Sequence, residues 1–366
     1  MPETPSPLVE LLADGKIYRN WTSARVSRSI EQACGDFTLE LADREFSEGL
    51  PPPILPGSEC ELRVRAGLSG PPQIAVTGYV DDVSVNYDAQ GHSTGVAGRD
   101  KAADLVDCSA AHGSGQWSGR TILQIARDLC RPFGITPKKD VDEGKAFSEF
   151  AIEEGESVFD CLRRAALMRG LLLISDGRGG IVFTRAGKSG AASPLELGRN
   201  IEQAAVQLSW KDRFSAYTVK GQGSGAGTPD DSAAPALQAK AKDEGITRHR
   251  PLIVLAEEAA SIQDVRTRAD HERSVRLARG LRYTATVGSW FDSDGNLWEP
   301  NTLVPVKDER ARLDGRLLLV SVALQLDEGG SSAVLELVAP EAYSLLPAAA
   351  KGQGLLQSLA QGKEAA

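Results

Sequence analysis

A chain of 366 residues is long for a single hydrophobic core, so its length predicts two or three domains. The composition, 41% hydrophobic and 25% charged residues, is typical of soluble globular proteins, and the net charge of −9 argues against a protein that grips nucleic acid through phosphate neutralisation. The sequence has no signal-peptide pattern and no apolar run of membrane-spanning length, so we expect neither secretion by a leader nor membrane insertion.

The first hundred residues have strand character and almost no helical pattern. Residues 8–12 predict a strand, Asp14-Gly15 a hairpin turn, and Ile17 the start of the partner strand. Alternating apolar side chains predict two further strands, at Phe37, Leu39 and Leu41 and at Leu62 and Val64. A small antiparallel barrel or sandwich is the expected outcome, because closure hides the edges that an open sheet exposes.

The stretch at residues 78–110 predicts a hairpin that leads into a helix. A strand is followed by turn-forming residues at 88–93 and by a second strand to about residue 98. Asp100 has the short side-chain oxygen needed to cap a helix that starts at Lys101.

Within the first of these strands, the apolar side chains change parity between Val80 and Val83. One extra residue must be absorbed at Asp81-Asp82, as a β-bulge would do. The two carboxylates could alternatively be a catalytic acid and base, but neighbours on a strand point to opposite faces. We therefore favour the bulge.

Two helices and then a hairpin are predicted from residue 118 onward. The first helix has one apolar stripe, formed by Ile122, Ile125, Ala126 and Leu129. Ser157 is a good N-cap for the second helix, and Gly170 is a good stop. Residues 171–185 follow as two short strands joined by a Gly-rich turn. Residues 111–190 are therefore expected to form a compact α+β module.

Strand character then returns and predicts a second β domain over residues 191–346. Residues 221–245 are rich in Gly, Ala, Ser and Pro and predict a flexible surface insertion. A charged helix is expected at 261–279, with Ile262, Val265 and Ala269 facing inward. Four strands should follow, at 281–287, 303–306, 317–326 and 333–338. Residues 347–366 predict a flexible tail that orders only against a partner.

Two hairpins share a pattern that suggests an internal duplication. Val83-Ser84-Val85 is followed by turn formers and a strand to Ala97, and Val320-Ser321-Val322 by similar turn formers and a strand to Ala339. Hairpins converge easily, so the match alone leaves convergence open. Two β domains on either side of a helical insert favour duplication.

No pattern indicates a catalytic, cofactor-binding or metal residue. The histidines lack the spacing of a helical metal site and are expected at the surface: His92, His112, His249 and His271. Ser114 lacks a nucleophile elbow, and the Gly-rich run at Gly221 does not lead into a helix. The Asp292-Ser-Asp-Gly-Asn turn lacks the twelfth-position Glu of a calcium loop, which is Leu303 here. We expect no enzyme, no cofactor and no bound metal.

The five cysteines are odd in number and far apart: Cys34, Cys60, Cys108, Cys130 and Cys161. None belongs to a Cys-x-x-Cys pair, which argues against a disulfide framework or a zinc site. We expect reduced, buried thiols.

Four blocks of sequence, in one order along residues 8–346, carry a family resemblance. The first is Gly98-Arg-Asp-Lys-Ala-Ala-Asp-Leu-Val-Asp-Cys-Ser-Ala110, and the others lie at 117–135, 154–187 and 295–304. Together they resemble the baseplate hub proteins of Mu-like contractile-tailed phages, in the late-control-D superfamily. Four blocks in order are more specific than any single motif.

The resemblance implies a homotrimeric ring that joins the sixfold tail tube to the threefold central spike and surrounds the DNA channel. Its implied partners are the tail tube protein or a tube initiator, the central spike and the baseplate wedge proteins. The protein would be made in the host cytoplasm and located in the virion baseplate.

The resemblance also implies an α+β, mainly β fold. Two similar small antiparallel β-barrel, tube-like domains, residues 1–110 and 191–346, would flank the inserted α+β module. Strands of neighbouring barrels could close a continuous ring, and the channel face is expected to be neutral to acidic. The alternatives are a tail-tip cell-wall hydrolase and a spike-base protein of a type VI secretion-like system.

Overall fold

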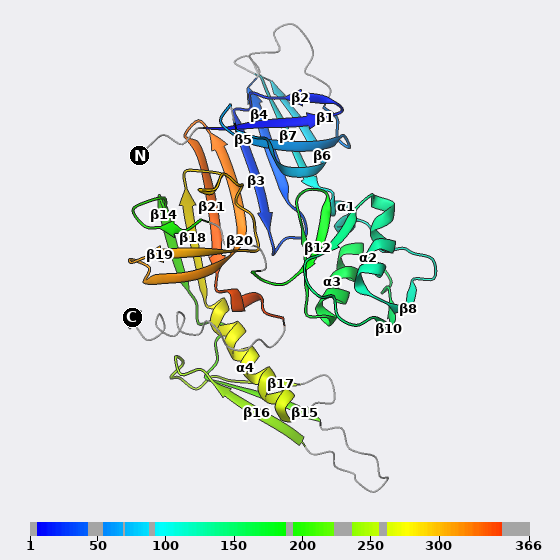
Figure 1. Ribbon diagram of the computed structural model, residues 1–366, viewed down its shortest axis with the longest axis vertical. Helices are drawn as coiled ribbons and strands as arrows, with labels where there is room; N and C mark the ends of the chain where they lie inside the picture. Colours follow the sequence, from blue (N-terminus) through cyan, green and yellow to red (C-terminus); the bar gives the residue numbers. More distant parts are fainter. Residues whose placement is uncertain are drawn as a thin grey trace.

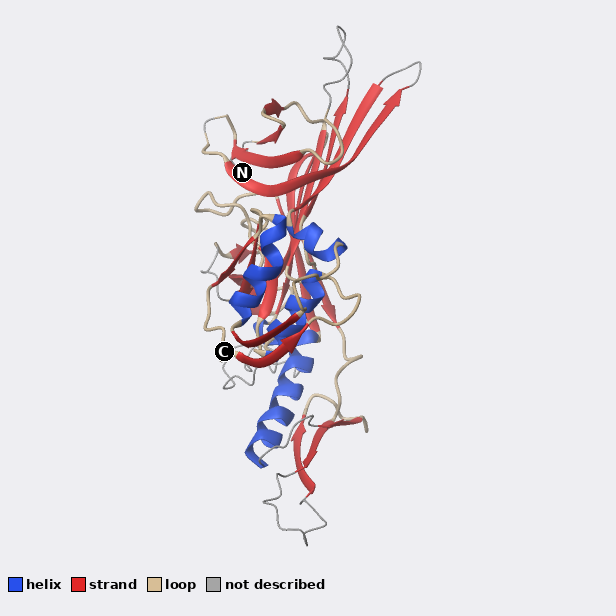
Figure 2. Ribbon diagram, turned by 90° about the vertical axis from the view of Figure 1, so that its right-hand side faces the viewer, coloured by secondary structure: helices blue, strands red, loops and turns tan. Residues whose placement is uncertain are grey.

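The computed structural model describes residues 6–42, 54–68, 70–87, 92–187, 193–222, 236–255 and 262–345. The described chain is mainly β, with a large twisted sheet, a helical module beside it, and a long helix with a small sheet below (Figure 1). Figure 2 shows the long strands of the sheet extending at one end and the long helix at the other. None of the helices in the described part is long and apolar enough to cross a membrane.

The large sheet has 13 strands. Its main path runs through β14 (Gln203–Leu208), β18 (Leu281–Val287), β21 (Gly330–Val338), β20 (Leu313–Asp327), β3 (Ser23–Ser29), β4 (Asp36–Ala42), β7 (His92–Asp100), β6 (Gln73–Tyr87), β5 (Glu59–Ala66), β1 (Pro7–Ala13) and β2 (Lys16–Tyr18). Beside this path, β19 (Thr302–Asp308) pairs with β20, and β13 (Leu195–Glu196) pairs with β19. The strands predicted from alternating apolar residues are all present in it.

One strand order occurs twice in this sheet. The first β half has the path β3-β4-β7-β6-β5, and the second has β14-β18-β21-β20-β19, with neighbours antiparallel throughout. Numbered along the chain, both paths read 1-2-5-4-3. The long strands β6 and β20 have 15 residues each, and each carries a bulge against its hairpin partner. This common order supports the predicted duplication, and the bulge predicted at Asp81-Asp82 is confirmed.

The two β halves are joined directly instead of forming two separate closed barrels. The first part of β20 pairs with β19, while its residues 321–326 pair with residues 24–29 of β3 in the other half. One apolar core accordingly includes side chains from both halves, such as Phe37, Leu62, Tyr283 and Leu319. Among the described strands the path stays open at its ends.

The helical module has its own core. It contains α1 (Ala102–Asp107), β8 (Gln116–Arg120), α2 (Ile122–Cys130), the 3₁₀ turn η1 (Arg131–Phe133), β9 (Thr136–Lys139), β10 (Phe147–Ala151), α3 (Val158–Met168), β11 (Leu172–Ser175) and β12 (Gly180–Thr184). The predicted stripe of α2 is buried, and Ser157 caps α3 by accepting the Asp160 amide at 3.1 Å. The pairing of β8 with β10 and the parallel pairing of β9 with β12 were not predicted.

A small unit is inserted between β14 and β18. Strands β15 (Ala216–Gln222), β16 (Ala236–Lys242) and β17 (Pro251–Leu255) form its sheet, and α4 (Ile262–Arg279) packs on it. Tyr217, Val265 and Ala269 are buried in its core, as predicted for the last two. The prediction of a flexible insertion at 221–245 is therefore wrong for β16. The buried positions of this strand are small alanines, which do not give the strong apolar alternation that indicates a strand. Residues 223–235 lie outside the described residues, as do the side chain of Ile262 and residues 346–366 of the predicted tail.

Candidate functional site at the junction of the sheet and the module

Asp100 lies where β7 turns into α1, and its side chain is completely buried. Its Oδ2 accepts hydrogen bonds from the Gly35 amide and the Ser175 hydroxyl, both at 2.7 Å, and its Oδ1 accepts from the Ala102 amide at 2.9 Å. Burial raises the pKa of this carboxyl, against the opposing effect of the hydrogen bonds. The predicted helix therefore starts at Ala102, one residue later than expected, and Asp100 joins it to the sheet and to β11.

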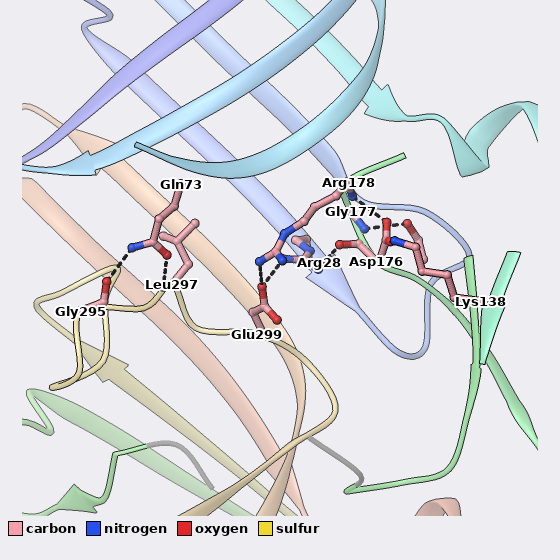
Figure 3. A network of polar contacts seen from close by, with 10 residues as sticks. Arg28, Gln73, Lys138, Asp176, Gly177, Arg178, Gly295, Leu297 and Glu299 are labelled. Carbon is pink, nitrogen blue, oxygen red and sulfur yellow. Dashed lines mark hydrogen bonds and ion pairs between the residues drawn. The ribbon is translucent and has the colours of Figure 1, made fainter. Parts of the chain in front are cut away.

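A charged cluster borders the same hollow as this carboxylate. Figure 3 shows the cluster residues Arg28, Lys138, Asp176, Arg178 and Glu299. Arg28 of β3 donates from Nη2 to the Asp176 carbonyl oxygen at 2.8 Å, and its Nη1 lies 3.8 Å from Glu299 Oε1. Arg178 pairs with the same Glu299 carboxylate, and Lys138 Nζ lies 2.9 Å from Asp176 Oδ2. Because the Arg28 side chain is only 12% exposed, its charge depends on these partners, and burial lowers its pKa.

The loop between β18 and β19 is fixed from two sides. Gln73 of β6 donates from Nε2 to the Gly295 carbonyl oxygen at 2.6 Å and accepts the Leu297 amide at 3.0 Å (Figure 3). Near the other end of the loop, buried Asn301 accepts the Gly187 amide at 2.8 Å. This loop of the second β half therefore contacts the first half and the chain that leaves the module.

The cluster borders a hollow of about 190 Å³. Its walls come from β3, from the module strands β9, β11 and β12, and from the loop before β19. On these walls Arg28 and Arg178 pair with Glu299, and Lys138 pairs with Asp176. Asp100 and Asp140 accept hydrogen bonds from neutral groups. The described residues hold no group of His, Cys, Asp or Glu that could bind a metal. The arrangement can hold three parts of the chain in fixed relative positions, and we describe it as the junction.

The predicted alternatives at Asp81-Asp82 are resolved by the neighbouring strand. Arg99 donates to Asp81 from Nε at 2.7 Å and also pairs with Asp107 at 2.8 Å. Asp82 is exposed on the other side of the bulge. Asp81 therefore has a structural ion pair, and the two carboxylates do not face each other as an acid and a base.

The histidines occupy different environments. His112 stacks on Trp117 with ring centroids 5.4 Å apart, and His249 is exposed. His271 was expected on the exposed side of α4 but is partly buried against the 3₁₀ turn η2 (Pro340–Tyr343), and its Nε2 lies 2.9 Å from the Ser344 carbonyl oxygen. Burial lowers the pKa of His271. The side chain of His92, in β7, lies outside the described residues.

The other motifs form turns. The Asp292 carboxylate accepts the amides of Asp294 and Asn296 at 3.0 and 2.9 Å, as expected for a hairpin-like turn. Ser114 is exposed in a turn closed by a hydrogen bond from the Gly115 amide to the His112 carbonyl oxygen.

The cysteines are unpaired thiols, and three of the five are buried. Burial raises the pKa of Cys60, Cys130 and Cys161 to about 12. The expectation of buried thiols is wrong for Cys108, which is exposed after α1, and Cys34 is partly buried.

Arg28 and Gln73 belong to the junction but were not predicted from the sequence. Arg28 nevertheless carries a signal, because it shares the inward parity of Ala24 and Val26, which are buried. A charged residue in the apolar row of a strand predicts a buried partner. Gln73 has no comparable signal, since it lies at the first position of its strand.

Comparisons with known proteins find matches for the two β halves, the module and the inserted unit of this chain. Family models fit residues 8–100 (Mu phage baseplate assembly protein GpP-like, N-terminal), 102–185 (Baseplate hub protein gp44-like, second domain), 213–271 (Tail protein NMB1110-like, third domain) and 261–346 (Mu phage baseplate assembly protein GpP, fourth domain). The baseplate hub protein gp44 of Escherichia phage Mu is 37% identical over 355 residues, which cover 93% of this chain and 90% of that protein. The chain belongs to the family of Mu-like phage baseplate hub proteins.

Solved structures agree with this membership. The 43 kDa tail protein of prophage MuSo2 from Shewanella oneidensis is 37% identical, with a TM-score of 0.79 over 92% of this chain and 99% of that one. A tail protein from Neisseria meningitidis MC58, 24% identical, shares the fold with a TM-score of 0.75 over 93% of this chain and 99% of that one. The resemblance carried by the four blocks is confirmed, and this hub protein is a structural tail protein of the virion baseplate.

Proposed function

We propose that this hub protein forms a homotrimeric ring that joins the sixfold tail tube to the threefold central spike. The observation that carries the proposal is the strand order that occurs twice in one chain. Three subunits with two such units each offer six near-equivalent positions to the tube and keep true threefold symmetry toward the spike. The ring acts by assembly, and the open sheet edges of its subunits join into one continuous ring of strands on trimer formation.

The proposed division of the chain follows the cores. The boundary expected at residue 110 is moved to residue 101, because Ala102 and Leu105 of α1 are buried in the module core. The first tube-like domain then covers residues 1–101, and the module covers residues 102–190. The second tube-like domain covers residues 191–346 and carries the β15–β17 and α4 unit as an insertion. The tube protein or tube initiator contacts the sixfold end, the spike the threefold end and the wedge proteins the periphery.

DNA passes the polar face of the sheet without being captured. The face away from the core carries neutral side chains such as Thr38, Ser84 and Gln207. Its charged residues have both signs: Glu40 and Glu336 beside Arg25 and Arg282. Arg282 is itself paired with Glu336 at 2.9 Å, which reduces its attraction for phosphate.

We expect the purified protein to leave duplex DNA unshifted on a native gel at physiological salt. Weak retardation at low salt should disappear as salt is added, because few phosphates are neutralised. Retardation that persists at physiological salt would show that the channel face was assigned wrongly.

The assembly itself is tested by the mass of the purified protein in solution, alone and with its spike protein. Light scattering should give three subunits, and averaged electron micrographs should show six lobes at one end. The same preparation should not clear a peptidoglycan suspension, since Arg99 holds Asp81 in an ion pair and the Asp81-Asp82 pair does not act as a catalytic acid and base. A monomer or dimer that persists when the spike is added would contradict the ring.

A further inference from the structure

Two strand edges of this subunit are exposed in the described structure. β14 pairs with β18 on one side only, and all six of its residues are exposed. β6 pairs with β5 up to Tyr79, and from Asp82 to Asn86 the only neighbouring strand among the described residues is β7. Large apolar side chains lie on both edges: Val85 is 50% exposed, Val206 39% and Leu208 60%. Such edges are templates for pairing with another chain.

The chain itself contains a template for how these edges pair. Residues 321–326 of β20 pair antiparallel with residues 24–29 of β3, which joins the two β halves. In the repeated strand order, β20 occupies the place of β6, and β3 the place of β14. The two strands that make the internal join are therefore the counterparts of the two strands with exposed edges.

The registers of the two sets of ladders can be aligned residue by residue. In the long hairpins, Asp82 opposite Ala97 corresponds to Ser321 opposite Glu336, each at the first pair after the bulge. In the pairing of β14 with β18, Gln207 lies opposite Arg282. This pair corresponds to Ser27 opposite Asp36 in the pairing of β3 with β4. The internal pairs Val322–Arg28 and Leu324–Val26 then translate into Val83–Leu208 and Val85–Val206.

We propose that β6 of one subunit pairs antiparallel with β14 of the next, with Val85 opposite Val206 and Val83 opposite Leu208. This interface rests on the proposed trimer and specifies its contacts. Each subunit offers one edge of each kind, so the contact is heterologous, and in the proposed trimer three such contacts close the ring. Each subunit would then contribute the sheet path that leads from β14 through β20 and β3 to β6. The paths of three copies would form one closed barrel.

The chemistry of the two edges agrees with this register. Val206 lies beside buried Tyr283 and Val83 beside buried Val96, so the pairing continues the apolar face of the sheet across the boundary. On the other face Ser84 meets Gln207, and this pair is polar and uncharged. Apolar cross-strand pairs of this kind stabilise a sheet, and no like charges are placed opposite each other.

Paired cysteines test the register. The double variant V85C/V206C, and independently S84C/Q207C, should give covalent trimers on a non-reducing gel after mild oxidation, because opposed residues lie within disulfide range. The background carries C108S, since native Cys108 is exposed. The matched control V85C/A204C places the second thiol two residues along β14, where the diagonal distance of about 7–8 Å is too long for a disulfide. Reductant should return all species to the monomer band.

Light scattering of the reduced variants separates this inference from the proposed function. Covalent trimers from both matched pairs and not from the control support the pairing. A trimer by mass without cross-links from either matched pair overturns the pairing and leaves the trimeric hub intact. Cross-linking of the control at an equal yield overturns the register. A monomer by mass that never cross-links overturns both.

Discussion

Replacing Asp100 with Ala should lower the stability of this hub protein by about 3–5 kcal/mol, because the side chain is buried and holds three donors. In the variant, the buried Gly35 and Ala102 amides lose their acceptor, and so does the partly buried Ser175 hydroxyl. Each unsatisfied buried donor costs about 1–3 kcal/mol. The positive charge of Arg28 nearby also loses a compensating carboxylate.

Urea denaturation followed by tryptophan fluorescence measures the effect. Trp117 reports on the module and Trp290 on the sheet, and both are buried. Asp314→Ala is the matched control, because Asp314 is exposed on β20 and its loss should change stability by about 0.5 kcal/mol or less. An unchanged midpoint for Asp100→Ala would show that the junction does not depend on this carboxylate.

The local elements of the fold could be predicted from the sequence, because their signals lie within a few residues. Alternating apolar residues defined β4 and β21, and Ser157 defined the start of α3. The partners of the strands were a different matter. The pairing of β20 with β3 joins segments about 300 residues apart in sequence, and no pattern in either strand identifies the other as its partner. Two barrels were expected because the family resemblance implies them, and for the first β half also because closure would hide the sheet edges.

The junction was predictable only in part. The blocks at 98–110, 154–187 and 295–304 carried the resemblance, and their residues Asp100, Asp176 and Glu299 all border one hollow. The sequence did not show that these blocks meet, since their polar residues at the hollow have no common spacing. Their convergence depends on the module packing against both β halves, which is a property of the complete fold.

The second prediction concerns Gly78, directly opposite Asp100 in the pairing of β6 with β7. A Cβ on Gly78 would lie 1.8 Å from the Arg99 carbonyl oxygen and 2.6 Å from the Asp100 Cα. Both are backbone atoms, so no side-chain rotation can relieve the clash and the two strands must separate. Gly78→Ala should therefore lower the free energy of unfolding by about 3 kcal/mol or more, which is the upper end of the range for overpacked sites.

Gly95→Ala in β7 is the matched control for this variant. The nearest atom to its added Cβ is the Ser84 Oγ at 2.6 Å, a hydroxyl that can rotate away. We expect Gly95→Ala to unfold in urea close to the midpoint of the parent protein, whereas Gly78→Ala should unfold much earlier or give no folded protein. Because a displaced β7 also moves Asp100, Gly78→Ala combined with Asp100→Ala should cost less than the sum of the two single losses. Equal midpoints for the two glycine variants would mean that β6 and β7 can separate at Gly78 without loss, and that the junction does not constrain the hairpin.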